Sequence, residues 1–269
     1  MSFLASQVAI VELNGDAQES FNHALKLIGK MDDLNTTERS VVVKVGVFNH
    51  KSPRINYPTI SVVSAIVNSF NKAPQIYLVE SDNYKGTGSE RLQIWKELFT
   101  ERVVPFNLSD DMDMKEVEVA NEKMRLSHIL FKPNVFVSTH VLRRYDKGTI
   151  LKNLFGLVPD RKKARLHKKL VAVLLDAYEA IGGVDLAVID ATRTYSGAAA
   201  IKALNTNFLV MGRDAVAVET VGAILVGLKP EKMQVIQEAV KRGLGEGDIE
   251  KIEVLGNPIE SIKERLRQL

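Results

Sequence analysis

The sequence contains no cysteine among its 269 residues. This absence excludes disulfide bonds, thiolate zinc sites, iron–sulfur clusters and a cysteine nucleophile together. Long apolar runs are also missing, since no stretch approaches the roughly 18 apolar residues that a membrane span needs. The N-terminus MSFLASQVAIVEL has no basic start, and Glu12 ends its apolar stretch too early for a signal peptide. We therefore expect a cytoplasmic protein that makes no membrane contact.

The composition is that of an ordinary globular protein. Apolar residues make up 45% of the chain and charged residues 26%, which excludes disordered and fibrous classes. The length suits one α/β domain over residues 1–269. Residues 103–130 show no clear period, and we expect a small subdomain or excursion there.

Short β-branched runs alternate with helical patterns along most of the chain. Strands are predicted at 8–13, 40–48, 75–81, 134–139, 185–190, 207–211 and 251–256. Helices are predicted at 16–31, 59–70, 90–100, 166–181, 215–226, 230–241 and 258–268. Several strands are continuously apolar, which is typical of strands covered on both faces. The sequence thus predicts an α/β fold, with a mainly parallel sheet covered by helices on both faces.

Polar side chains close several of these strands, and in an open parallel sheet ligands bind at the carboxyl ends of the strands. Histidines and carboxylates there suit acid–base or metal chemistry. His140, Glu80 and Asp190 are our candidate catalytic residues, which would move a proton. The alternative is that each merely caps a strand end.

Positive charge is concentrated between residues 141 and 169. This segment contains ten Lys or Arg and only two acidic residues, Asp146 and Asp160, whereas the net charge of the whole chain is +3. Lysine and arginine together suit phosphate or carboxylate. Lys44 interrupts an apolar strand, so it either lies at an edge or points at an anion or carboxylate. We assign Lys162, Lys163, Lys168 and Lys169 to a solvated helix face. The candidate substrate-binding residues are Lys44, Asn49, His50, Lys152, Asn153, Arg165, His167 and Arg213.

Two acids belong to the helix predicted at 215–226, one just before its first residue and one within it. Asp214 stands at the N-cap position, so Asp214→Asn should cost little stability, because asparagine also caps well. Glu219 lies within the apolar segment AVAVETVGAILV, where a buried carboxylate needs a partner. We expect Glu219 to pair with Lys44, Lys152, Arg213 or backbone donors. Both acids should hold the residues that line the pocket in place without contacting the ligand.

Blocks of sequence resemble, in order and spacing, the domain of unknown function 362 family. They are GVFNHKSPRINYPT from Gly46, VESD from Val79, STH from Ser138, LKNLFGLVPDRKKARLH from Leu151, DLAVIDA from Asp185 and GRDAVAVETVGAILVGL from Gly212. The resemblance runs from about residue 41 to residue 245. It implies functional positions at Lys44, Asn49, Glu80, Ser81, Thr139, His140, Lys152, Asn153, His167, Asp214 and Glu219, but it implies no reaction. ATRTYSGAAAIK departs from the family's glycine-rich stretch and keeps only Gly197.

Three hypotheses about function follow. The first is an enzyme that binds a small substrate bearing phosphate or carboxylate. The second is a nucleic-acid-binding accessory protein that uses residues 141–169, although Tyr145 and Phe155 are few aromatics for stacking. The third is a metal-dependent variant of the enzyme, with His50, His140, Asp190 and Glu219 as ligands. GxGxxG, P-loop, GxSxG, HExxH and EF-hand motifs are absent, so the sequence names no cofactor, and it does not specify the oligomeric state.

Overall fold

A computed structural model describes residues 5–51, 56–197 and 202–269. Parts of two segments discussed above, GVFNHKSPRINYPT and ATRTYSGAAAIK, lie outside the described residues. No helix in the described part of the chain has the length and apolar character needed to cross a membrane.

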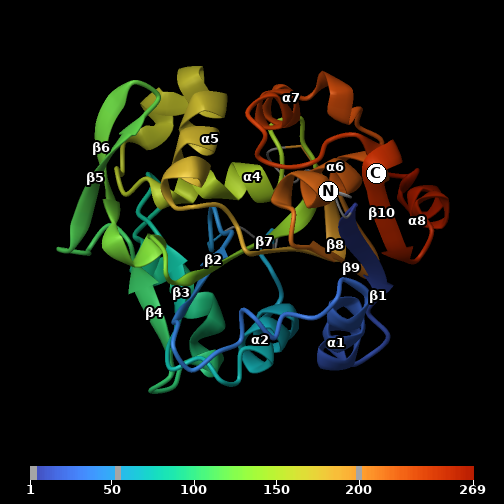
Figure 1. The fold of residues 1–269 in the computed structure, drawn as a ribbon, viewed down its shortest axis with the longest axis horizontal. Helices are drawn as coiled ribbons and strands as arrows, with labels where there is room; N and C mark the ends of the chain where they lie inside the picture. Colours follow the sequence, from blue (N-terminus) through green and yellow to red (C-terminus); the bar gives the residue numbers. More distant parts are fainter. Residues whose placement is uncertain (1–4, 52–55, 198–201) are drawn as a thin grey trace.

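The centre of the fold is an eight-stranded sheet in the order β10-β1-β9-β8-β7-β2-β3-β4 (Figure 1). Its strands are β1 (Ser6–Glu12), β2 (Val41–Val45), β3 (Ile76–Glu80), β4 (Val103–Asn107), β7 (Val135–Arg144), β8 (Leu186–Ser196), β9 (Ala203–Gly212) and β10 (Ile252–Gly256). β9 runs antiparallel to both of its neighbours, and the other pairings are parallel. The predicted mainly parallel α/β fold is therefore confirmed.

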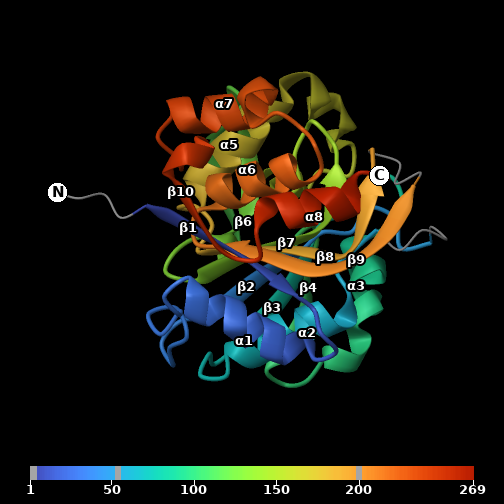
Figure 2. The ribbon, with the colours of Figure 1, turned by 90° about the vertical axis from the view of Figure 1, so that its right-hand side faces the viewer.

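Helices cover both faces of the sheet (Figure 2). One face carries α1 (Ala17–Leu27), α2 (Ile60–Ser69) and α3 (Gly88–Leu92), and the other carries α5 (Leu170–Ala180), α6 (Ala215–Leu225), α7 (Gln234–Lys241) and α8 (Ile259–Leu266). The short helix α4 (Ile150–Asn153) contacts both β7 and α6. Short 3₁₀ turns are η1 (Gln93–Leu98), η2 (His128–Leu130), η3 (Leu154–Leu157), η4 (Lys163–Lys169), η5 (Pro230–Lys232) and η6 (Ile249–Lys251).

The continuously apolar strands are explained by the two helical layers. In β2, Val41, Val43 and Val45 pack into the core layer of α1 and α2, whereas Val42 packs into the opposite layer with α5 and α6. Successive side chains of a strand point to opposite faces, so a strand covered twice is apolar at every position. Lys44 is the polar exception in β2, and it is 1% exposed.

The region without a clear period, residues 103–130, forms two structures. β4 adds an edge strand to the main sheet beside β3. β5 (Met114–Val119) and β6 (Glu122–Ser127) then pair as an antiparallel hairpin outside that sheet.

Candidate functional site

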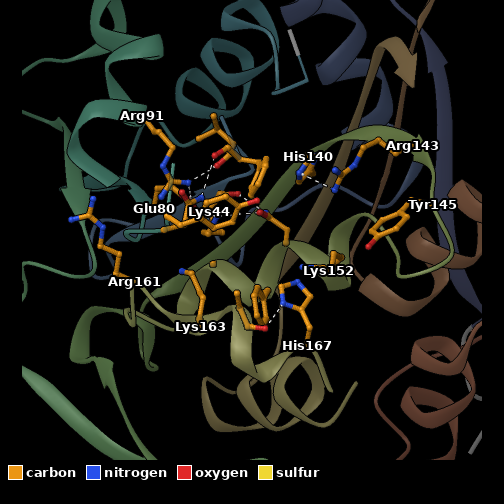
Figure 3. Close-up of a pocket in the computed structure, with 18 residues that line it drawn as sticks. Lys44, Glu80, Arg91, His140, Arg143, Tyr145, Lys152, Arg161, Lys163 and His167 are labelled. Carbon is orange, nitrogen blue, oxygen red and sulfur yellow. Dashed lines mark hydrogen bonds and ion pairs between the residues drawn. The ribbon is translucent and has the colours of Figure 1, made fainter. Parts of the chain in front are cut away.

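A cavity of about 410 Å³ opens at the carboxyl ends of β2 and β3 and beside β7 (Figure 3). Segments far apart in the sequence meet there, because β2 pairs in parallel with both β3 and β7. Its basic lining side chains are Lys44, Arg91, Arg143, Lys152, Arg161 and Lys163. Glu80 is the carboxylate among the lining residues. The excess of positive charge favours an anion in the cavity.

Glu80 holds two of these cations in a buried ion triad. Lys44 Nζ lies 2.5 Å from Glu80 Oε1, and Arg91 Nη1 lies 3.0 Å from Glu80 Oε2. Arg91 also donates to the carbonyls of Val47 and Ser81. Both oxygens of Glu80 are thus ion-paired, so this carboxylate anchors the wall of the cavity and is poorly placed to move a proton.

Lys44 has no donor to spare for a ligand. Besides Glu80, its ammonium donates to the Val45 carbonyl and to Asn153 Oδ1, each at 3.1 Å. Burial lowers the pKa of Lys44, while the Glu80 carboxylate raises it. Of the two alternatives for this lysine, the structure selects the one in which it faces a carboxylate.

Asn153 fastens α4 to the sheet. Its amide nitrogen donates to the Lys44 carbonyl at 3.0 Å, to Ser138 Oγ at 3.1 Å and to the Thr139 carbonyl at 3.2 Å. The side chain therefore joins α4 to both β2 and β7. Asn153 lines the cavity, but its contacts are those of a positioning residue.

Four cations of the cavity have no carboxylate within 4.0 Å among the described residues: Arg143, Lys152, Lys163 and the exposed Arg161. Lys163 is 6% exposed and donates to Ser81 Oγ at 2.5 Å and to the Val158 carbonyl at 2.7 Å. Burial lowers its pKa to about 8. Its assignment to a solvated face was wrong, because the 3₁₀ turn η4 points this side chain inward while Lys162 stays exposed.

Lys152 stands over an aromatic ring. Its Nζ lies 4.2 Å from the centre of the Phe155 ring. Burial lowers the pKa of Lys152 to about 7, and the charges of Arg143 and Lys163 act in the same direction. An amine with a pKa near neutrality exists in both protonation states at pH 7, which suits acid–base catalysis.

His140 lies next to Arg143, with 3.3 Å between His140 Nε2 and Arg143 Nη2. Since a guanidinium only donates, Nε2 of His140 accepts in this contact, and we assign the ring proton to Nδ1. Burial lowers the pKa of His140 well below its ordinary value, and the charge of Arg143 adds to this. His140 Nδ1 and Arg143 Nε are buried without a partner among the described residues. These two nitrogen atoms are therefore available to hydrogen-bond a ligand or water in the cavity.

Gly156 brings the backbone of η3 against the ion triad. A Cβ at this position would lie 2.5 Å from Lys44 Cε and 2.6 Å from Glu80 Oε1. The block LKNLFG is thereby accounted for. Lys152 and Phe155 line the cavity, Asn153 joins the sheet, Leu154 is buried in the core and Gly156 permits the close approach.

The two acids near α6 act on the backbone. Asp214 caps α6, as predicted, by accepting from the amides of Val216 and Ala217. Glu219 accepts from the amides of Thr149 and Leu151 at 2.7 to 2.9 Å, so backbone donors are its partners. Glu219 thus holds the first turn of α4, the helix that carries Lys152 and Asn153.

Five of the residues predicted as catalytic or substrate-binding are not among the cavity's lining residues: Asp190, Asn49, His50, Arg165 and Arg213. Asp190 accepts from Thr59 N, Thr59 Oγ1 and Thr192 N, so the expected catalytic acid instead braces the start of α2. Arg165 pairs with Glu122 and Asp160 on the surface, and Arg213 pairs with Asp33. Asn49 and His50 lie in the loop after β2, where Asn49 accepts from the amide of Lys51.

His167 does line the cavity. Its Nδ1 donates to the Ala164 carbonyl, and its ring centre lies 4.8 Å from that of Phe155. Sequence reasoning missed four cations as cavity residues: Arg91, Arg143, Arg161 and Lys163. The last three stood within the basic stretch, but a local pattern does not separate inward from outward side chains there. Arg91 carried no signal, because a helical arginine is ordinarily exposed.

The metal ligands of the third hypothesis, His50, His140, Asp190 and Glu219, do not form a cluster. Within residues 5–51, 56–197 and 202–269, no group of three or more His, Asp or Glu is placed to hold a metal ion. The basic stretch is also divided. Arg143, Lys152, Arg161 and Lys163 enter the cavity, whereas Lys147, Arg165 and Lys169 pair with surface acids.

Comparison with known proteins identifies the family of this chain. The model of a family described as "Domain of unknown function (DUF362)" matches residues 41–224. No curated protein matches the chain. Among solved structures, the lactate racemase apoprotein from Thermoanaerobacterium thermosaccharolyticum is similar at 11% identity and a TM-score of 0.46, over 82% of this chain. The chain spans 57% of that protein's length.

Proposed function

The chain belongs to the DUF362 family, and from this premise we propose that it is an enzyme whose cavity binds a small anionic substrate, bearing phosphate or carboxylate, and exchanges a proton with it. One observation carries the proposal. Arg143, Lys152 and Lys163 line one cavity, and no carboxylate of the described residues lies within 4.0 Å to form an ion pair with them. Burying uncompensated charge is costly, so such a site is best explained by a ligand of opposite charge.

Lys152 and His140 are the proposed proton-transfer groups. Lys152 has a pKa of about 7, and His140 is neutral at that pH because its pKa is lowered. An arriving anion favours the charged forms of both side chains and raises both pKa values. Lys152 would then gain a proton as the substrate binds, and it could deliver that proton during the reaction. Glu80 remains in the ion triad throughout.

Proton uptake tests the binding part of the proposal. We expect inorganic phosphate to bind with net proton uptake at pH 8, measured by titration calorimetry in buffers of different ionisation enthalpy. Lys152→Met should weaken binding and reduce the uptake, whereas Lys168→Met, at an exposed lysine of the same basic stretch, should change neither. Binding of phosphate that is identical in the wild type and Lys152→Met would count against the proposed site.

Proton exchange with a ligand tests the enzymatic part. Small 2-oxo acids and phosphorylated carbonyl compounds, incubated with the protein in D₂O, would show deuterium incorporation by NMR at the carbon next to the carbonyl. Loss of that exchange in Lys152→Met, with retained exchange in Lys168→Met, would support Lys152 as a proton-transfer group. An absence of exchange across the panel, despite binding, would limit the protein to a binding role for these compounds.

A further inference from the structure

The cations of the cavity lie at two separate ends. Arg143 and Tyr145 are at one side, Arg161 and Lys163 are at the other, and Lys152 lies between them (Figure 3). The electrostatics agree with this order. The charges of both Arg143 and Lys163 act on Lys152, while the charges that act most on Lys163 are those of Glu80, Lys44 and Arg91.

Each end has a buried cation with unused donors. Arg143 is 8% exposed, and its Nε has no partner within the described part of the chain. Lys163 is 6% exposed, and its two contacts, with Ser81 and Val158, leave one ammonium proton. A single small anion at either end would leave the other cation uncompensated.

Aromatic side chains line the same cavity. Phe155 and His167 lie 4.8 Å apart by ring centres, and Phe48 and Tyr84 meet edge to face at 5.5 Å. All four line the cavity, although Phe48 and Tyr84 are 42% and 62% exposed. Aromatic walls favour an apolar or planar ligand body with little polar surface of its own.

Resting on the proposed function, we infer that the ligand carries two separate anionic groups joined by an apolar or planar body, with one anion at Arg143 and the other at Lys163. The class comprises aromatic or unsaturated compounds that bear a phosphate at one end and a carboxylate or second phosphate at the other. Both ends contribute charge-assisted hydrogen bonds, and the body replaces water along the rings.

The test compares ligands with one and with two anionic ends. Titration calorimetry is run with inorganic phosphate, benzoate, phenyl phosphate and the 2-, 3- and 4-carboxyphenyl phosphates. We expect at least one carboxyphenyl phosphate to bind about tenfold or more tightly than phenyl phosphate and benzoate, since each added charged contact is worth about that factor. If all three isomers bind no better than phenyl phosphate, the two-ended ligand is wrong.

Variants at the two ends assign the contacts. Arg143→Gln and Lys163→Gln should each weaken the best two-ended probe by about tenfold or more, whereas only one of them should weaken phenyl phosphate. The exposed neighbours provide matched controls, Arg144→Gln and Lys162→Gln, which should leave both affinities unchanged. Arg143→Lys and Lys163→Arg retain the charge and should keep most of the affinity, and thermal melts verify that each variant folds.

The outcomes separate the two claims. Suppose that Arg143→Gln and Lys163→Gln both weaken the binding of phenyl phosphate, and that the carboxyphenyl phosphates bind no more tightly than phenyl phosphate. The cavity then binds anions as proposed, but the inference of a ligand with two anionic ends is wrong. If no probe binds, inorganic phosphate included, the proposed function itself is wrong. Equal losses in the end variants and their neighbouring controls would also contradict the assigned contacts.

Discussion

The imidazole ring of His140 fills the space beside Gly46. A Cβ atom at residue 46 would lie 2.1 Å from Cδ2 of His140, closer than any van der Waals contact permits. Gly46 follows β2, and its amide donates to the Thr139 carbonyl of β7, so the two backbones are tied at this point. The glycine is therefore required by the position of a candidate catalytic ring.

Gly46→Ala should destabilise the protein by about 1–3 kcal/mol, because the added methyl group overpacks the site. In a His140→Ala background the ring is gone, so the same substitution should cost much less. Urea unfolding of the wild type, the two single variants and the double variant gives the coupling energy. An equal cost of Gly46→Ala in both backgrounds would show that the ring is not the obstacle.

Glu219→Ala should cost about 2–4 kcal/mol of stability and should weaken phosphate binding. The substitution leaves two buried amides without an acceptor, each at about 1–3 kcal/mol. It also frees the first turn of α4, which positions Lys152. Urea unfolding and phosphate titration measure the two effects. If the variant is destabilised but folded and binds phosphate as tightly as the wild type, Glu219 does not contribute to phosphate binding.

Asp214→Asn should cost more than its capping role alone suggests. Asp214 Oδ1 caps α6, but Oδ2 also accepts from Ser6 Oγ at 2.7 Å and from the Glu246 amide at 2.8 Å. An asparagine can still cap α6 through its oxygen, but its NH2 group cannot accept the hydrogen bond from the Glu246 amide. We expect the loss of that bond to cost about 1–2 kcal/mol of stability. The expectation of a small effect is revised accordingly. Thermal melts of Asp214→Asn and Ser6→Ala check this, and phosphate affinity should be unchanged.

Lys152→Met should stabilise the ligand-free protein by about 1 kcal/mol or more at pH 6.5, because it removes an uncompensated cation and keeps an apolar stem against Phe155. The pKa is about 7 in the folded chain against an ordinary 10.5, so between these values the unfolded chain binds more protons. Stability from this group therefore rises with pH over that window. The advantage of the variant should shrink from pH 6.5 to pH 9 in urea unfolding. A constant difference would contradict the lowered pKa.

Asp190→Asn should lower stability without changing phosphate affinity. The carboxylate accepts from Thr59 N at 2.6 Å, from Thr59 Oγ1 at 2.8 Å and from Thr192 N at 2.8 Å, so the asparagine amide leaves at least one of these donors without an acceptor. We expect a cost of about 1–2 kcal/mol. Thermal melts and phosphate titration measure the two quantities. A loss of phosphate affinity with unchanged stability would instead support the original prediction that Asp190 is a catalytic residue.

Part of the candidate site follows from sequence because strand ends are readable locally. Lys44 within an apolar strand, Glu80 and His140 at strand ends, and the LKNLFG block all point to one edge of a parallel sheet. The N-cap at Asp214 is also local, since a carboxylate before a helical pattern accepts that helix's first amides.

The sequence by itself determined the class of fold, because strands covered on both faces must be apolar at every position and helices must show their own period. It did not determine the direction of β9, since a short apolar run reads alike in a parallel and an antiparallel pairing. The tertiary structure alone decided which polar groups enter the cavity. Lys44 and Asn153 are 109 residues apart, and Lys163 and Ser81 are 82 apart. Such distant contacts decide whether a side chain is ion-paired, binds the backbone at a helix start or lines a cavity. The positions of Asp190 and Lys163 therefore could not be predicted from local sequence.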